Sequence, residues 1–302
     1  MNFKGLDLNL LVALDAVLSE RSVSRAAERL FLSQPAMSNA LARLRDYFHD
    51  PLVVQQGRQL MLTPRSEALR QPVHDVLMMV EAAIADSSDF DPAKVEREVR
   101  VLASDFTTRV LLRPLLERLS ALAPNIRFNV LSQSAVHVAD LLDRGEVDLL
   151  IIPTRFQHPD HPAEPLFEES YVCVLWSGNT SASAQLTFDE YVAAEHVVVE
   201  FAGGRAPAFD SWFLDRFGIV RRIAVRTQSL TNLCELVVGT QRIATVHRRL
   251  AEFETRALPL RMCEPPLDIP KVVECVQWHR VRSHDPVLRW LIEQLRAVAA
   301  EI

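Results

Sequence analysis

Two short stretches with apolar residues at helical spacing follow each other near the start of the chain. Their inward faces carry apolar side chains, namely Ala26, Ala27 and Leu30 in the first stretch and Met37, Leu41 and Leu44 in the second. Ser22 and Ser33 precede the two stretches, where a hydroxyl can cap a helix. Pro35 falls in the first turn of the second helix, where its missing N–H does no harm. The pattern predicts two helices joined by a tight turn at Phe31 and Leu32.

The second helix of this pair is predicted to expose a polar face. That face carries hydrogen-bonding and cationic side chains, namely Gln34, Ser38, Asn39, Arg43 and Arg45. Glutamine and asparagine can form two hydrogen bonds with an adenine edge, and arginine can bind guanine or phosphate. The face therefore suits DNA. The alternative is a helical hairpin inside a larger α-helical domain.

The flanking residues favour the DNA-binding interpretation. Residues 6–18 have apolar side chains at helical spacing and predict a supporting third helix. Residues 51–55 and 59–63 are short β-prone runs, and they predict a hairpin with Arg58 at its tip. Three helices and a basic-tipped hairpin are typical of a winged helix-turn-helix DNA-binding domain, which we place at residues 1–64.

A long helix is predicted from Pro64 to about Ser87. Its apolar residues have alternating spacings of four and three, as in a coiled-coil seam: Leu69, Val73, Val76, Val80 and Ala83. Pro72 is expected to kink the helix, because it removes one backbone hydrogen bond. The length of the helix favours a dimerisation linker over residues 65–90. The alternative is that it packs in the core of the N-terminal domain.

Beyond this helix, short β-prone runs alternate with helical stretches, which predicts an α/β domain with parallel sheet covered on both faces. One group of predicted strands comprises residues 99–103, 127–131, 147–152 and 272–278. A second group comprises residues 171–175, 196–199, 223–225 and 243–246. The fold class is therefore α/β with an all-α N-terminal part.

The two groups of strands are predicted to form two lobes of one α/β domain. Proline-containing segments at residues 162–165 and 264–270 are expected to cross between them. Lobe I then comprises residues 91–164 and 268–302, and lobe II comprises residues 165–267. Together the lobes make up a domain of residues 91–302.

Ligands in such α/β folds bind beyond the carboxyl ends of strands, where helix N-termini also point. The side chains that we expect to line one crevice there are Ser104, Asp105, Phe106, Ser132, Pro153 and Thr154 from lobe I, and Glu200, Phe201, Ser229 and His247 from lobe II. For any single serine or threonine a simple helix cap is the alternative, so the prediction concerns the set.

The chain resembles the LysR-type transcriptional regulators. The matching residues are Ala26, Ala27, Leu30, Ser33, Gln34, Pro35, Ala36, Ser38, Leu41, Leu44, Pro51, Leu52, Gly57, Arg58, Leu62, Thr63 and Pro64. Residues 5–16 and 40–48 resemble most the branch with the NodD-like and NahR-like regulators. The exposed face and this resemblance together assign DNA contact to Ser33, Gln34, Pro35, Ser38, Asn39, Arg43, Arg45 and Arg58.

The resemblance also implies the architecture and partners of the protein. It implies a winged helix-turn-helix, a linker helix and an effector domain like a two-lobed periplasmic binding protein. It further implies a homodimer that assembles into a homotetramer, double-stranded promoter DNA as the target, and RNA polymerase as a partner. Two departures concern the wing: Gln55 and Gln56 replace a usual basic residue, and Ser66 replaces a usual glycine.

Composition limits the remaining possibilities. The chain has 302 residues, enough for more than one domain, and its net charge of -6 argues against broad affinity for nucleic acid. The cysteines have no CxxC spacing and are expected to be reduced and buried: Cys173, Cys234, Cys263 and Cys275. The sequence shows neither a signal peptide nor an apolar run long enough to span a membrane, which predicts a cytoplasmic protein.

The sequence contains none of the motifs that would indicate an enzyme. It has no GxSxG, HExxH, Walker or GxGxxG pattern, so we expect no catalytic residue, no cofactor and no metal. His158 and His161 are expected to be solvated rather than metal-binding. The helix-turn-helix excludes a free solute-binding protein, and a purely structural DNA-binding protein would not need the α/β half.

These features predict a regulator whose promoter binding responds to a small aromatic effector. The alternative is a constitutive DNA-binding repressor without an effector. Because Asp105 and Glu200 would repel an anion, neutral phenolics are favoured over aromatic acids. Neither the effector, the target promoter nor the direction of control follows from the sequence.

Overall fold

The computed structural model describes residues 6–56, 59–85, 90–132, 138–200, 212–213 and 216–302. The chain divides into two compact units: residues 1–90 with the short segments 143–146 and 279–286, and the remaining residues. No helix in the described parts is long and apolar enough to cross a membrane.

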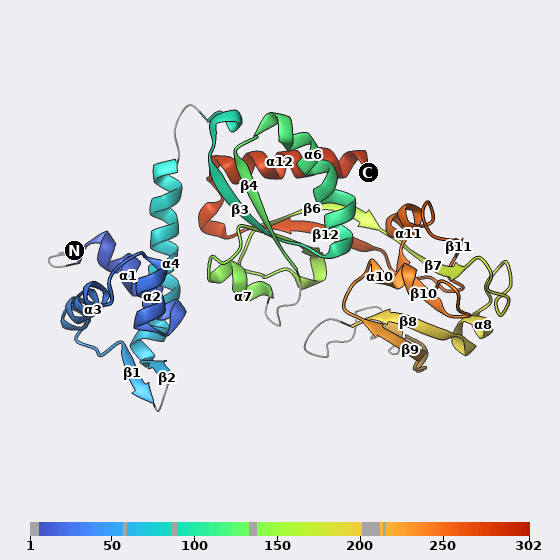
Figure 1. Ribbon diagram of the computed structural model, residues 1–302, viewed down its shortest axis with the longest axis horizontal. Helices are drawn as coiled ribbons and strands as arrows, with labels where there is room; N and C mark the ends of the chain where they lie inside the picture. The colour runs from blue at the N-terminus through green and yellow to red at the C-terminus, as the bar shows by residue number, and fades with distance from the viewer. Residues whose placement is uncertain (1–5, 57–58, 86–89, 133–137, 201–211, 214–215) are drawn as a thin grey trace. The chain divides into compact units, whose positions relative to one another are not determined.

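The N-terminal unit contains the predicted helices and hairpin (Figure 1). Its elements are α1 (Leu8–Glu20), α2 (Val23–Arg29), α3 (Gln34–Phe48), β1 (Val53–Gln56), β2 (Gln59–Leu62) and α4 (Pro64–Ala85). Leu14, Met37 and Leu44 are fully buried at the centre of its core. Ala26 and Ala27 are also buried, and their small side chains let α2 approach α1 and α3 closely.

Local hydrogen bonds fix the ends of the two paired helices as the sequence predicts. Ser22 Oγ accepts a hydrogen bond from Arg25 N at 3.3 Å, and Ser33 Oγ accepts one from Ala36 N at 3.3 Å. Between the helices, Phe31 has a left-handed backbone with φ 55°. This conformation makes the turn tight enough to place α3 across α2.

Ser66, at a departure from the family pattern, closes the base of the wing. Its hydroxyl donates a hydrogen bond to Leu52 O at 2.7 Å, and it is completely buried. Leu52 has a left-handed backbone with φ 61°, and its N–H donates to Asp50 Oδ1 at 2.7 Å. Strands β1 and β2 then pair in antiparallel register from Val53 opposite Leu62 to Gln56 opposite Gln59. Ser66 therefore supports the wing.

Some apolar residues of helix α4 pack in the core of the N-terminal unit, and others are exposed. Leu69, Val73 and Leu77 pack against the core of the N-terminal unit, so for these residues the core-helix alternative was correct. Val73 is buried in this core, and Leu69 is partly buried against it. Val76 and Met79 lie on another face and are 43% and 53% exposed. These two residues mark the apolar face of α4 that the core does not cover.

The second unit contains two five-stranded sheets. One has the order β4 (Ile126–Leu131), β3 (Arg97–Leu102), β5 (Leu149–Pro153), β12 (Val272–Gln277) and β6 (Ala163–Glu169). The other has the order β11 (Leu260–Cys263), β7 (Tyr171–Trp176), β10 (Ile243–His247), β8 (Glu195–Val199) and β9 (Arg222–Thr227). The chain crosses between the sheets from β6 to β7 and from β11 to β12, as expected for two lobes.

The sheets are mixed, so the prediction of parallel sheet was only partly correct. Strands β3, β4 and β5 are parallel, whereas β12 runs antiparallel to β5 and β6. In the other sheet β8 is parallel to β9 and β10, whereas β7 runs antiparallel to β10 and β11. In each sheet the strand that runs against the other four is the first one after a crossover, β12 in lobe I and β7 in lobe II.

Helices cover the sheets of both lobes (Figure 1). Those of lobe I are α5 (Asp105–Thr107), the π-helical segment Thr108–Leu112, α6 (Arg113–Leu122), α7 (Val138–Asp143) and α12 (Pro286–Glu301). Those of lobe II are α8 (Phe188–Ala193), α10 (Asn232–Glu235) and α11 (Arg248–Glu254). Short 3-10 turns occur at Pro92–Lys94, Thr154–Phe156 and Arg280–Arg282. Residues Leu141 and Leu142 of α7 pack on Leu150 and Ile152 of β5.

Candidate functional site

The exposed face of α3 is the candidate DNA interface. All the predicted contact residues on it are exposed: Ser33, Gln34, Pro35, Ser38, Asn39, Arg43 and Arg45. Met37, Leu41 and Leu44 hold the opposite face in the core, which fixes the rotation of the helix. Side chains four residues apart lie above one another on a helix, so Gln34 and Ser38 form one row, and Pro35 and Asn39 the next.

The two arginines of α3 are not equivalent. Arg45 Nε donates to Pro51 O at 2.8 Å and Arg45 Nη2 donates to Val53 O at 3.5 Å, so this side chain ties α3 to the first strand of the wing. Arg43 Nη2 lies 3.5 Å from Asp7 Oδ2, in an exposed ion pair that DNA phosphate can replace. The wing arginine, Arg58, lies outside the described residues.

The predicted effector residues lie at strand ends, as the sequence indicated. Ser104 is buried, caps α5 and accepts a hydrogen bond from Thr107 N at 3.0 Å. Ser132 follows β4 and is exposed. Glu200 follows β8, and its carboxylate pairs with Arg226 Nε at 2.7 Å. Phe201 lies outside the described residues.

Asp105 joins the two lobes directly. Its Oδ2 accepts hydrogen bonds from Ser229 Oγ at 2.6 Å, Thr231 N at 2.9 Å and Thr231 Oγ1 at 2.8 Å, and its Oδ1 accepts one from Leu230 N at 3.2 Å. Burial alone would raise the pKa of Asp105, but these hydrogen bonds outweigh it and lower the pKa. We call Asp105 with Ser229–Thr231 the Asp105 clasp.

Aromatic and ionic contacts extend the junction between the lobes. The Phe106 ring of lobe I packs on His247 of lobe II, with centroids 4.3 Å apart. His247 is buried, which lowers its pKa to about 4 and keeps the ring neutral. Arg109 forms an ion pair with Glu254 of α11. Ser229, Phe106 and His247 therefore contact residues of the opposite lobe.

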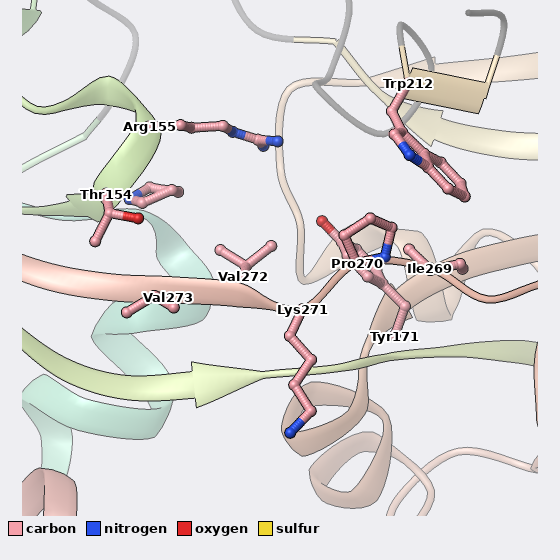
Figure 2. Close-up of a pocket in the computed structure, with 10 residues that line it drawn as sticks. Thr154, Arg155, Tyr171, Trp212, Ile269, Pro270, Lys271, Val272 and Val273 are labelled. Carbon is pink, nitrogen blue, oxygen red and sulfur yellow. The ribbon is translucent and has the colours of Figure 1, made fainter. Parts of the chain in front are cut away.

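A cavity lies beside this junction, where the crossovers meet lobe I (Figure 2). It has a volume of about 170 Å³. The residues that line it are Pro153, Thr154, Arg155, Tyr171, Trp212, Ile269, Pro270, Lys271, Val272 and Val273. Of the predicted effector residues, this set contains Pro153 and Thr154. The sequence analysis missed the others, although 264–270 was correctly identified as a crossover.

Charged groups lie next to the cavity. Arg155 forms a hydrogen bond with the Tyr171 hydroxyl. Glu274, one pleat beyond Val272 on the same face of β12, is 3% exposed. Burial raises the pKa of Glu274 to about 7, and the negative charge of Glu169 contributes to this increase. The positive charge of Arg155 opposes it. At neutral pH this carboxyl is therefore largely or partly protonated.

Substituting Glu274 provides a test of this buried carboxyl. Its ordinary pKa of 4.5 describes the unfolded chain, so native stability conferred by the neutral form is lost as the pH rises from about 4.5 through 7. Glu274→Gln has no such loss. Relative to the wild type, its free energy of unfolding should rise by about 3 kcal/mol between pH 4.5 and 8.

Urea unfolding of the full chain, followed by tryptophan fluorescence, measures this difference, because all four tryptophans belong to the second unit. Glu168→Gln is the control, since Glu168 is exposed and its pKa is lowered by Lys271. A stability difference between Glu274→Gln and wild type that does not vary with pH would contradict the assignment.

The histidine and cysteine predictions have different outcomes. The cysteines Cys173, Cys234, Cys263 and Cys275 are all buried and free, as predicted. For His161 the prediction of a solvated ring was wrong, because it is buried. Gln277 Nε2 donates to the carbonyls of His158 and His161 at 2.8 and 3.1 Å, so the neighbouring loop is held against β12.

The described elements define a winged helix-turn-helix protein with a two-lobed α/β domain. Residues 8–67 match the bacterial regulatory helix-turn-helix proteins of the lysR family, and residues 92–300 match the LysR substrate binding domain. The chain is 43% identical over 305 residues to Nodulation protein D of Bradyrhizobium sp. (strain ANU 289), covering 100% of this chain and 90% of that protein.

Solved structures show the same architecture. A probable transcriptional regulator from Pseudomonas aeruginosa is 29% identical and covers 98% of both chains, with a TM-score of 0.67. Full-length OxyR from the same organism is 20% identical, with a TM-score of 0.76 over 98% of this chain and 97% of that one. The chain belongs to the LysR family of transcriptional regulators. The predicted resemblance, including its NodD-like branch, is confirmed, and the protein is a regulator rather than an enzyme.

Proposed function

We propose that this regulator binds promoter DNA through α3 and the wing, as a homodimer or homotetramer, and that a small aromatic effector bound between the lobes modulates this binding. The observation that supports the effector is the cavity beside the junction between the lobes, where Tyr171 of the cavity wall packs on His247. Residues of both lobes and of a crossover line this cavity. A ligand there would contact the segments that set the angle between the lobes. Such a ligand shifts the equilibrium between two arrangements by its difference in affinity for them.

The proposal also includes an oligomer of this chain and an effect on RNA polymerase. The predicted DNA face has only a modest excess of arginine over acidic residues, so one copy would bind DNA weakly. Two or four copies engage several grooves at once and multiply that affinity. A change in their arrangement would alter the bend of the promoter and thereby the access of RNA polymerase.

Footprinting on the DNA upstream of the protein's own gene tests this function. We expect a protected region whose extent changes when an aromatic effector is added. The Asp105 clasp supports a second candidate, a constitutive repressor, because its hydrogen bonds join the lobes directly. A footprint that no member of a panel of phenols, aromatic acids and flavonoids alters would favour that candidate.

Substitutions on α3 should separate base reading from phosphate binding. Gln34→Ala and Ser38→Ala each remove a candidate base contact and should weaken specific binding by about 1–3 kcal/mol, without affecting nonspecific DNA. Arg43→Ala should weaken binding to all sequences alike, because it removes a candidate phosphate contact. Fluorescence anisotropy with specific and scrambled duplexes measures both effects.

Arg118→Gln is the control for these variants, because Arg118 is paired with Glu301 at 3.2 Å in the second unit. Unchanged affinity for the specific duplex in all three α3 variants would remove this face of α3 as the reading surface.

A further inference from the structure

The walls of the cavity suit one flat ring. Trp212, Ile269, Pro270, Val272 and Val273 supply aromatic and branched apolar surface (Figure 2). The volume of about 170 Å³ is close to that of engineered apolar cavities of about 150 Å³ that bind benzene. A single substituted ring therefore matches this volume, whereas the fused and linked rings of a flavonoid would extend out of it.

The cavity also carries a cation suited to an anionic ligand. Arg155 extends from beside Thr154 toward the side that carries Trp212 (Figure 2). Its guanidinium forms a hydrogen bond with the Tyr171 hydroxyl, and no carboxylate of the described residues lies within ion-pair distance of it. Lys271 forms an exposed ion pair with Glu168, with Nζ 2.9 Å from Oε2. Arg155 is therefore the cation of this wall that has no carboxylate partner among the described residues.

The acids that were expected to repel an anion are compensated. The carboxylate of Asp105 is occupied by the hydrogen bonds of the clasp, and that of Glu200 by Arg226. Glu274, close to Arg155, is buried, and burial raises its pKa to about 7, so at neutral pH it cancels the positive charge of Arg155 only in part. The electrostatic reason for favouring neutral phenolics therefore does not hold at this cavity.

We propose that the cavity binds a single-ring aromatic carboxylate, with the carboxylate on Arg155 and the ring between Trp212 and the wall of Pro270 and Val272. This inference rests on the proposed effector function and narrows it to one ligand class. A guanidinium can donate two parallel hydrogen bonds to a carboxylate, which fixes the orientation of the ring as well as its charge. The ligand thereby links lobe I to the crossover and to Trp212 of lobe II.

Calorimetry on the full-length protein with benzoate and benzamide tests the charge requirement, because the two molecules have nearly the same shape. We expect benzoate to bind at least about tenfold more tightly than benzamide. Arg155→Gln should remove this preference and leave the affinity for benzamide within about twofold. Arg118→Gln, which removes an exposed arginine elsewhere in lobe I, should keep the preference.

The ligand pair tests the proposal even where Arg155→Gln alters folding, since benzoate and benzamide are compared on the wild type. Equal affinity for the two, or an unchanged preference in folded Arg155→Gln, overturns the proposal. Tight binding of the flavonoid naringenin that Arg155→Gln leaves intact also overturns it, while a footprint that changes with naringenin would uphold the proposed function. Conversely, benzoate binding that depends on Arg155 but alters no footprint supports this site and contradicts effector control of DNA binding.

Discussion

Val76→Asp and Met79→Asp should each split the assembly of this protein and abolish its tight binding to promoter DNA. Both side chains lie on the face of α4 that the N-terminal core leaves uncovered, and Leu8 and Val12 of α1 are also exposed apolar residues. A second copy of the same helix can cover this face as a dimer. An aspartate there would be buried without a partner, which costs several kcal/mol at each of two symmetric positions.

Light scattering coupled to size exclusion measures the mass, and circular dichroism confirms that the helices remain folded. Val76→Ala is the matched control, because it shortens the side chain without adding charge and should keep the assembly at micromolar concentration. DNA affinity should fall by about 100-fold or more in the aspartate variants, because single copies lose the benefit of linked half-sites. Unchanged mass for both would exclude this face as the seam.

The N-terminal unit was predictable because its signals are local. Ser22 and Ser33 cap their helices through bonds that span three residues, and the apolar spacing alone sets the inward face of α3. The arrangement of α4 was less predictable, since one apolar repeat contains residues that pack in the core and residues that remain exposed. The structure distinguishes these two groups of residues, because Val73 packs in the core whereas Val76 is exposed.

In the second unit, the sequence located most strands but not their directions. Strand β6 was not predicted, because it contains Pro165, and proline argues against a central strand. Strand β6 is an edge strand of its sheet. The mixture of parallel and antiparallel pairs follows from the two crossovers, which a reading of local pattern does not reveal.

The sequence predicted that the candidate effector site lies at the ends of strands, but it did not predict which residues contact each other there. Asp105 and Ser229 were assigned to one crevice because strand ends meet there, yet they are 124 residues apart and bond to each other. Trp212 and Lys271 enter the cavity from segments with no ligand-binding motif. Their contribution depends on tertiary packing alone.

Removing the Asp105 clasp should have the largest effect within the second unit. Asp105→Ala leaves the N–H groups of Leu230 and Thr231 without their carboxylate, and water can replace only part of the lost hydrogen bonding. We expect the unfolding free energy of this unit to fall by about 3 kcal/mol, which lowers its melting temperature by roughly 6–12 °C. Tryptophan fluorescence during heating of the full-length protein measures this change.

The same substitution tests whether the clasp fixes the arrangement of the lobes. If it does, the promoter footprint of Asp105→Ala should change without added effector, because the lobes can then move relative to each other. Because the pKa of Asp105 is lowered in the folded protein, the stabilisation is present above its ordinary value of 3.8. The stability difference from wild type should therefore shrink as the pH falls through the lowered pKa.

Asp91→Ala is the control for the clasp. Asp91 is an exposed aspartate that caps a short turn, accepting a hydrogen bond from Ala93 N at 3.1 Å and pairing with Lys94 at 3.0 Å. Since both contacts are local and solvated, its loss should lower the melting temperature by less than about 2 °C. Equal shifts for Asp91→Ala and Asp105→Ala would mean that the hydrogen bonds between the lobes add no stability beyond that of an ordinary surface cap. In that case the lobes would be held together by the packing of Phe106 on His247 and by the ion pair of Arg109 with Glu254.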